Sequence, residues 1–271
     1  GSRVLVGPIE HACVHETLKS SATRLSVTYV GVDEEGLLDA DEIAELAGDV
    51  DAVITMAVNN EIGTIQPMSR IADACRLAGT SLLTDITQAV GRIPVDLNDW
   101  DVRAGWMSSH KIYGPQGIGA LIWRGTTAPR PLSTGGGQER GVRPGTVPTA
   151  LAVGFGKACE LAGQEMERDN HHVTVLSARF LASLRRRHPD LIVNGSIEQR
   201  IPHNLNLAFR GVDADALVGM LPSLAISTGS ACSAGAIGVS RVLSAIASDE
   251  VASSSIRIGF GRTTTTDEVD Q

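Results

Sequence analysis

Residues 51–85, DAVITMAVNNEIGTIQPMSRIADACRLAGTSLLTD, hold two short apolar runs on either side of an amphipathic segment. The runs 51–57 and 81–84 have the length and the content of Val, Ile and Leu that are typical of buried strands. The segment 68–78 has the periodicity of a helix. A strand, a helix and a second strand in this order predict a βαβ unit with parallel strands.

The same alternation extends outward from this unit. Further strands are predicted at 3–6, 26–30 and 118–123, and helices at 10–20 and 39–47. Together these segments predict an α/β fold with a largely parallel sheet. The residues that follow two of the strands, 59–63 and 85–88, would lie at the carboxyl edge of that sheet, where open α/β folds bind ligands.

The second half of the chain has a different pattern. A helical period runs from Thr149 towards His188, and Pro189 predicts where it ends. We expect so long a helix to bridge two lobes. Later strands are predicted at 191–193, 204–209 and 255–260, and helices at 213–221 and 240–247. This mixture indicates a smaller α+β lobe.

Composition excludes several classes of protein. The 271 residues carry 23 Lys and Arg against 31 Asp and Glu, and this net charge of −8 disfavours direct binding to nucleic acid or to an anionic membrane. The longest apolar stretches, such as 52–58, are far shorter than the roughly 20 residues that cross a bilayer. Four separated cysteines without a Cys-x-x-Cys pair suggest neither a disulfide framework nor a zinc site, and they predict a reducing, cytoplasmic location.

Several motifs could carry chemistry, and each has a plainer alternative. Lys111, just before a Tyr-Gly-Pro turn, could form a Schiff base with an aldehyde, or it could be a solvated lysine beside the turn. Asp85 could keep a proton on the nitrogen of a heteroaromatic ring, and Gln88 could donate to a ring oxygen. The alternative is that Asp85 caps a helix that starts at Thr87.

Two motifs in the first half could serve the same ligand. His11, before a predicted helix, could stack on a planar cofactor or move protons, or it could be a half-exposed residue of the helix cap. Asn60, in the Asn-Asn-Glu-Ile-Gly stretch, could offer a side-chain amide or belong to an ordinary turn.

Three motifs lie in the second half. Cys232, within STGSACSAG at 227–235, could be a thiolate nucleophile that travels, or a buried, inert thiol. Arg257 could bind a carboxylate with both nitrogens of its fork, or form a surface salt bridge. The glycine-rich stretch 135–146 could offer backbone N–H groups and Thr146 to a phosphate, or be a mobile loop.

The order of the motifs is more specific than any one of them. In chain order they are Glu-His, Asn-Asn-Glu-Ile-Gly, Asp-x-x-Gln, Ser-x-His-Lys-Ile-Tyr-Gly-Pro, Gly-Gly-Gly-x-Glu-Arg-Gly-x-Arg-x-Gly-Thr, Gly-Ser-Ala-Cys and Ser-Ser-Ile-Arg. This series, from Glu10 to Glu268, resembles the pyridoxal-phosphate-dependent cysteine desulfurases, a NifS/IscS-like group of the class V aminotransferase family. The resemblance implies a fold-type I transferase, with the large cofactor-binding domain over 1–165 and a small C-terminal domain over 166–271.

The resemblance also implies a role for each matching residue at the cofactor ring. Lys111 would bind pyridoxal phosphate covalently and then move the Cα proton of the substrate. His11 would stack on the ring and assist the proton transfer. Asp85 would keep the ring nitrogen protonated, and Gln88 would bond the phenolic oxygen.

Other residues would hold the phosphate and the substrate. Ser108 and His110 resemble the phosphate ligands of this segment, and Thr146 resembles the ligand that is donated across a homodimer interface. Asn60, which would also contact the cofactor, and Arg257 would bind the substrate carboxylate.

The implied reaction takes sulfur from L-cysteine, leaving L-alanine and a persulfide on Cys232 for a sulfur-acceptor protein, as in iron–sulfur cluster assembly. A selenocysteine lyase and a desulfurase dedicated to tRNA thiolation or DNA phosphorothioation remain alternatives. So does an inactive, truncated scaffold for acceptor proteins.

The sequence departs from the family pattern at three positions. Ser109 stands where a glycine is usual, Ile86 where a small residue is usual, and Gln138 where a histidine is common. No phosphate-binding stretch precedes Arg3, and the capping box at 265–268 opens a helix close to the last residue. We therefore expect a chain that is truncated at its N-terminus and near its C-terminus.

Overall fold

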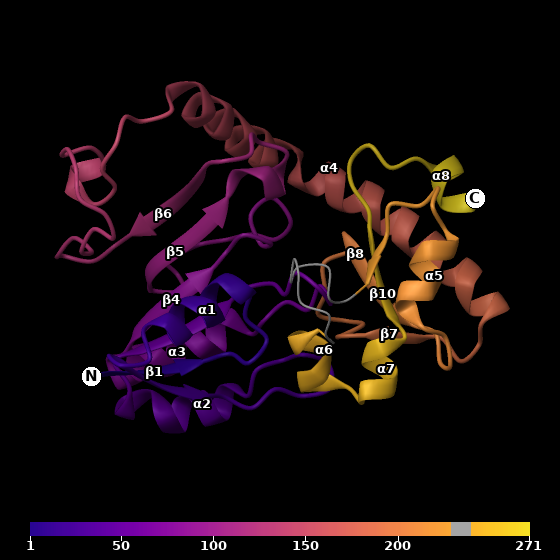
Figure 1. Cartoon of the computed structure of the whole chain (residues 1–271), viewed down its shortest axis with the longest axis horizontal. Helices are drawn as coiled ribbons and strands as arrows, with labels where there is room; N and C mark the ends of the chain where they lie inside the picture. Colours follow the sequence, from indigo (N-terminus) through magenta and orange to yellow (C-terminus); the bar gives the residue numbers. More distant parts are fainter. Residues whose placement is uncertain (229–239) are drawn as a thin grey trace.

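The computed structural model describes residues 1–228 and 240–271. Its elements form two lobes, each built around one sheet, and the long helix α4 (Thr149–Arg187) runs through both (Figure 1). Among the described residues, no helix combines the length and the apolar character needed to cross a membrane.

The larger sheet has six strands in the order β2-β1-β3-β4-β5-β6. These strands are β1 (Ser2–Val6), β2 (Leu25–Tyr29), β3 (Ala52–Met56), β4 (Ser81–Asp85), β5 (Val102–Ser108) and β6 (Gly119–Trp123). All neighbours pair in parallel except β5 and β6, which are antiparallel. The prediction of an α/β fold with a largely parallel sheet is confirmed. Every residue of the central strand β3 is buried, because both faces of the sheet are covered.

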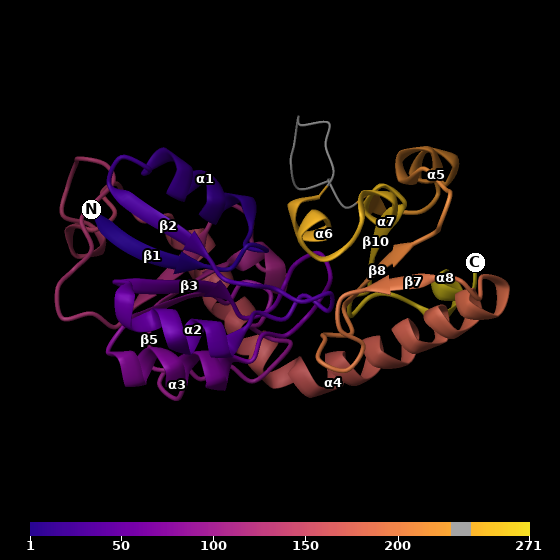
Figure 2. The same cartoon turned by 90° about the horizontal axis from the view of Figure 1, so that it is seen from below.

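Helices cover this sheet on two sides. Figure 2 shows α1 (Ala12–Ser20) on one side, and α2 (Ala40–Leu46) and α3 (Met68–Ala78) on the other. In α3 the buried residues include Ile71 and Cys75, four positions apart, so that one helical stripe faces the core. Short 3-10 turns complete this lobe and the segment after it, at η1 (Ala47–Asp49), η2 (Ser109–Ile112) and η3 (Glu139–Gly141).

Helix α4 belongs to two hydrophobic cores. Phe155, Ala158 and Ala162 pack in the core of the large lobe. Val173 and Leu176 pack in the core of the small lobe, against strand residues that follow the helix. The predicted bridging helix and its end before Pro189 are therefore confirmed. The predicted domain boundary, between residues 165 and 166, falls inside this helix and stays a prediction.

The small lobe holds a four-stranded sheet in the order β7-β8-β10-β9, with antiparallel pairs. Its strands are β7 (Ile192–Asn194), β8 (Asn204–Ala208), β9 (Ser227–Thr228) and β10 (Ser255–Gly259), and its helices are α5 (Ala214–Met220), α6 (Arg241–Ile246), α7 (Asp249–Ser253) and α8 (Thr266–Asp270). The predicted capping box is present, since Thr265 and Glu268 bond each other's backbone N–H at the start of α8. Strand β9 and helix α7 have no counterpart among the predicted elements.

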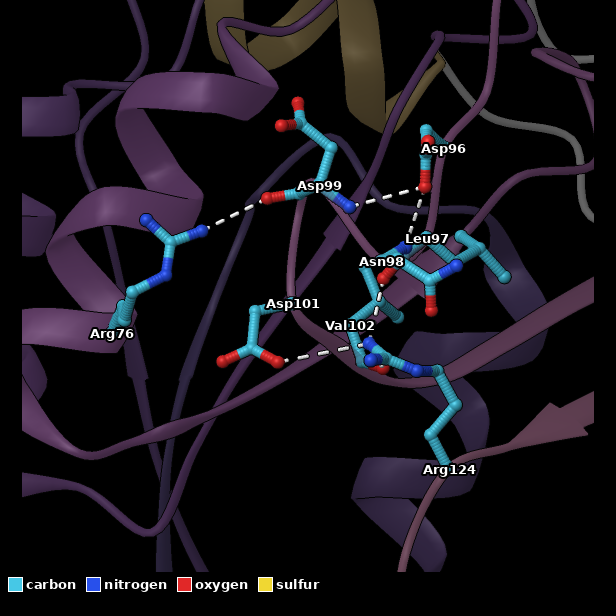
Figure 3. Close-up of polar contacts among 8 residues, drawn as sticks. All are labelled: Arg76, Asp96, Leu97, Asn98, Asp99, Asp101, Val102 and Arg124. Carbon is cyan, nitrogen blue, oxygen red and sulfur yellow. Dashed lines mark hydrogen bonds and ion pairs between the residues drawn. The ribbon is translucent and has the colours of Figure 1, made fainter.

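One arginine fixes the end of the large sheet at which β5 begins. Arg124, just after β6, donates through Nη1 to the backbone oxygens of Leu97 (2.7 Å) and Val102 (3.0 Å), and lies 3.7 Å from a carboxylate oxygen of Asp101 (Figure 3). These contacts set where β5 starts. The opposite end of β5 leads directly into the segment that holds Lys111.

Candidate functional site

The candidate residues of the first half gather at the carboxyl edge of the large sheet. His11 follows β1, Asn60 follows β3, Asp85 ends β4, and the segment 108–111 follows from β5. These four strands are parallel, so their carboxyl ends meet at one edge. That edge faces the small lobe (Figure 1). The structure thus brings together side chains that are up to 100 positions apart in the sequence.

Asp85 is buried and has one oxygen already in use. Its Oδ1 accepts the backbone N–H of Thr87 at 2.8 Å, so the capping alternative is partly true, although a turn and not a helix follows. In the described part of the chain, Oδ2 accepts no hydrogen bond. The next residue, Ile86, is buried in the core of the large lobe. Its bulk is therefore packed away among apolar side chains.

His11 is the N-cap of α1. Its Nδ1 accepts the backbone N–H of Cys13 at 3.2 Å. Because Nδ1 is the acceptor, the proton of the neutral ring lies on Nε2. The helix cap, which was the plainer alternative for this residue, also fixes the orientation of the ring.

Lys111 lies in η2 and is exposed, as is His110. The chain then turns sharply, because Tyr113 adopts a left-handed conformation with φ of 64°. Gly114 follows, and a Cβ atom there would overlap the hydroxyl of Ser109 and crowd Ala158. The serine at position 109 therefore fits this turn only because residue 114 has no side chain.

Arg92 links the turn after β4 to Lys111. Its Nη1 donates to Oε1 of Gln88, and its Nη2 lies 3.4 Å from the backbone oxygen of Lys111. Desolvation lowers the pKa of the Arg92 guanidinium to about 10. Sequence reasoning did not single out Arg92. Its position four residues after Gln88 is a signal that could have found it.

Arg257 and Asn60 connect the two lobes. Arg257 lies in β10, opposite Ser227 of β9 and Asn206 of β8. Its Nη1 donates to the backbone oxygen of Asn60 at 3.2 Å. The side-chain Oδ1 of Asn60 is buried, and no described residue bonds it. An arginine and an amide are thus placed beside each other at the edge of the sheet.

Two buried carboxyl groups accompany these residues. Glu10 accepts the backbone N–H of Met56 through Oε1 at 2.7 Å, and burial raises the pKa of its carboxyl group well above the usual value. Glu61 accepts the hydroxyl of Ser240, and burial also raises the pKa of its carboxyl group, while Arg257 and His11 oppose that rise. Neither glutamate was among the predicted site residues.

The structure describes no side-chain contact between this group and either Ser108 or Thr146. Ser108 ends β5 one turn before Lys111, and no described side-chain contact links it to the others. Thr146 is exposed in the segment before α4 and has no described contact with the sheet edge. Cys232 lies outside the described residues. Gln138 bonds within its own segment, where its Oε1 accepts the N–H of Gly145 at 3.0 Å.

Comparison with known proteins identifies the relatives of this chain. The class-V aminotransferase family matches residues 1–271. The cysteine desulfurase of Mus musculus is 44% identical over 266 residues, which are 96% of this chain and 58% of the mouse protein. The cysteine desulfurase IscS of Rickettsia typhi is 42% identical over 266 residues, which are 96% of this chain and 65% of that protein. The chain thus spans less than two thirds of the length of either relative.

A solved structure shares the fold. The structure of a NifS-like protein superposes with a TM-score of 0.89 at 31% identity, and the match covers 99% of this chain and 72% of that one. The mixed α/β arrangement with a mostly parallel sheet is therefore that of the NifS-like enzymes. Since the family match extends over every residue of the sequence, the chain belongs to the class-V aminotransferase family.

Proposed function

We propose that this chain forms part of a pyridoxal-phosphate-dependent cysteine desulfurase, a transferase that removes sulfur from L-cysteine. The observation that carries the proposal is the hydrogen bond from the Arg257 guanidinium to the backbone oxygen of Asn60, at the sheet edge that holds Asp85 and Lys111, where this guanidinium could bind a carboxylate. The names of the two curated relatives, both cysteine desulfurases, support it.

The residues at the sheet edge suit pyridoxal phosphate. Asp85 has a carboxylate oxygen that accepts no described hydrogen bond and could accept one from the protonated ring nitrogen. Gln88 can donate from its amide, and the His11 ring is fixed by its cap. Lys111 supplies the amine for the aldehyde. When bound there, the cofactor would supply an electron sink that makes the Cα proton of the substrate acidic.

Each proposed site residue then has one role in the reaction. Arg257 and Asn60 bind the carboxylate of L-cysteine and set its orientation. Lys111 takes the Cα proton with its amine and returns a proton to the product. His11 holds a proton on Nε2 beside the reacting group. Asp85 would accept a hydrogen bond from the protonated ring nitrogen.

Cys232 is proposed as the nucleophile. Its thiolate attacks the substrate sulfur, so that the S–S bond forms as the C–S bond breaks, and the substrate carbon ends as alanine once protonated. The sulfur stays on Cys232 as a persulfide for an acceptor protein. Thr228, the last described residue before Cys232, pairs with Ile256, next to Arg257 in β10.

The remaining proposals concern the phosphate, the assembly and the location. Ser108 and His110 would bind the phosphate with Thr146 of a second copy, since Thr146 is exposed and makes no described contact with the sheet edge. The chain would then act as a homodimer. We infer a cytoplasmic location from the separated cysteines, three of which, Cys13, Cys75 and Cys159, are free thiols.

Absorbance and sulfide release test the proposal. The purified protein should gain a visible absorbance band with pyridoxal phosphate, and Lys111→Ala should abolish it. Cys232→Ser should keep the band but release neither sulfide nor alanine from L-cysteine. Cys159→Ser, a change of an exposed free cysteine on α4, is the matched control and should behave as the unchanged protein. A wild-type protein that stays colourless would favour the scaffold alternative, and undiminished sulfide from Cys232→Ser would exclude Cys232 as nucleophile.

A further inference from the structure

Arg92 is a half-buried cation that has no acidic partner within residues 1–228 and 240–271. Its guanidinium forms no ion pair with any described carboxylate. Its acceptors are neutral oxygens instead, namely Oε1 of Gln88, the backbone oxygen of Gln88 at 3.4 Å and the backbone oxygen of Lys111 at 3.4 Å. A cation that is withdrawn from water usually has a carboxylate partner. Because the acceptors of Arg92 are neutral, we infer that its role is to hold these acceptor groups in position.

The contact determines which way the Gln88 amide points. A guanidinium has only donors, whereas an amide has an accepting oxygen at one end and a donating NH2 at the other. Oε1 of Gln88 therefore faces Arg92, and the NH2 group faces the opposite direction. A glutamine without such a neighbour could present either end to a ligand.

Arg92 is itself held in place. Its backbone N–H donates to the oxygen of Ala89 at 3.0 Å, and its backbone oxygen accepts from the side chain of Asn170, in α4, at 2.8 Å. The helix that joins the two lobes thus fixes the arginine, and the arginine fixes Gln88 together with the carbonyl group of Lys111.

We propose that Arg92 is a positioning residue that keeps the NH2 group of Gln88 directed at the phenolic oxygen of the cofactor, at a constant spacing from Lys111. This inference rests on the proposed function. A donor that always faces this oxygen favours its ionised form, whereas an amide free to rotate would also present its own oxygen and disfavour that form. Without Arg92, the chromophore formed by Lys111 and pyridoxal phosphate should therefore titrate at higher pH.

A double-mutant cycle separates orientation from charge. The pH midpoint of the absorbance band is measured for the unchanged protein, Arg92→Met, Gln88→Leu and the double variant. Arg92→Met should raise the midpoint by about one pH unit, the size that one hydrogen bond to a charged group gives. In the Gln88→Leu background the same change should have no further effect. An equal rise in both backgrounds would show that Arg92 acts through its charge alone, and would overturn the proposal.

Control variants deal with folding. Arg124→Met removes an arginine that also donates to two backbone oxygens, but at the opposite edge of the sheet, and it should leave the midpoint unchanged. If Arg92→Met does not fold, Arg92→Lys replaces it in the cycle. A single ammonium group cannot bond Gln88 and Lys111 with the geometry of a guanidinium. We therefore expect Arg92→Lys also to raise the pH midpoint of the absorbance band.

A measurement without cofactor keeps this inference distinct from the proposed function. In the cofactor-free protein, nitrogen relaxation of the Gln88 side-chain amide should show a rigid NH2 group that becomes mobile in Arg92→Met. Equal mobility in both proteins would overturn the positioning role, whatever the absorbance experiments show. A rigid Gln88 in a protein that never binds pyridoxal phosphate would instead refute the proposed function and the assignment of the oxygen that Gln88 faces.

Discussion

The hydroxyl of Tyr113 accepts the backbone N–H of Arg262 at 3.0 Å, and the Arg262 guanidinium lies 4.4 Å from the centre of the Tyr113 ring. Tyr113 comes two residues after Lys111, and Arg262 comes shortly after β10, the strand of Arg257. The turn of the proposed cofactor lysine is therefore attached to the strand of the proposed substrate arginine. The relative position of the two lobes at the site depends on this contact.

The contact between Tyr113 and Arg262 depends in turn on the carboxylate of Asp169, which forms an ion pair with Arg262. Its Oδ2 lies 2.6 Å from Nη2 of Arg262, and both side chains are largely withdrawn from water, at 9% and 24% exposure. Asp169→Ala should lower the free energy of unfolding by about 3 kcal/mol, because it leaves a poorly solvated guanidinium without its partner. Denaturant titration measures this change.

A second ion pair of the same length provides the control. Arg179 and Asp270 are also 2.6 Å apart, but about half of each side chain is exposed. Asp270→Ala should change the stability little, because water already solvates both charges. A loss in Asp270→Ala as large as that in Asp169→Ala would show that burial does not set the strength of these pairs.

His203 should make the protein sensitive to mild acid. It is buried, and desolvation, with a smaller contribution from Arg92, lowers the pKa of its ring to about 4. The unfolded chain, with a histidine pKa near 6.5, binds the proton first as the pH falls. The contribution of neutral His203 to the free energy of unfolding is therefore complete above about pH 6.5. It is lost progressively as the pH falls to about 4, by up to about 3 kcal/mol.

Histidine variants test this pH dependence. His203→Gln should flatten the fall in unfolding free energy between pH 6.5 and pH 4, as measured by denaturant titration at several pH values. His171→Gln, on the exposed side of α4, should leave the fall unchanged. A slope that survives in His203→Gln would assign the acid sensitivity to other groups.

Glu10 should have the opposite pH dependence. Burial raises the pKa of its carboxyl group, and the nearby Asp85 raises it further, so the folded protein holds a proton that the unfolded chain releases near its ordinary pKa. Stability from this group is complete below the unfolded pKa and declines as the pH rises towards the folded one. Glu10→Gln resembles the protonated acid and can still accept from Met56.

The comparison of Glu10→Gln with the unchanged protein is therefore made at two pH values. The variant should be the more stable protein at pH 8 and should differ little at pH 4, as measured by chemical denaturation. Glu16→Gln, on the exposed side of α1, should show no such difference. A variant that is less stable at pH 8 would mean that Glu10 is ionised in the folded protein.

The sequence predicts those elements whose formation depends on their own residues. Strand β3 is buried at every position and is therefore an unbroken apolar run, and the period of α4 continues until Pro189. Strand β9 has only two residues and exists because β10 pairs with it, so no local pattern indicates it. The predicted parallel strands 51–57 and 81–84 also indicated that the residues after them, Asp85 included, lie at one edge of the sheet.

What the sequence does not predict are contacts made by side chains across elements. In the sequence, Arg92 is one basic residue in a turn. Its contacts with Gln88 and Lys111 form only when the turn after β4 folds back beside Lys111. Glu10 and Glu61 read as ordinary acids, because burial of a carboxyl group depends on the strands packed around it. The same limit applies to Thr146, whose exposure does not follow from its place in the glycine-rich motif.

Ser109 gives a prediction in which removing a polar group should stabilise the protein. Its hydroxyl is fully buried, and no described residue bonds it, so folding removes it from water without compensation. Ser109→Ala removes only this hydroxyl, which is the side-chain atom of Ser109 that lies beside Gly114. The free energy of unfolding should rise by about 1 kcal/mol.

A buried serine with a satisfied hydroxyl gives the opposite expectation. Ser177 is also buried, but its Oγ donates to the backbone oxygen of Thr174 at 3.2 Å, so Ser177→Ala should destabilise the protein or leave it unchanged. Thermal and denaturant unfolding of both variants measure the difference in sign. Since Ser109 lies two residues before Lys111, a destabilised Ser109→Ala would show that its hydroxyl has a partner in the folded protein, and would point to a bound water or ligand at that turn.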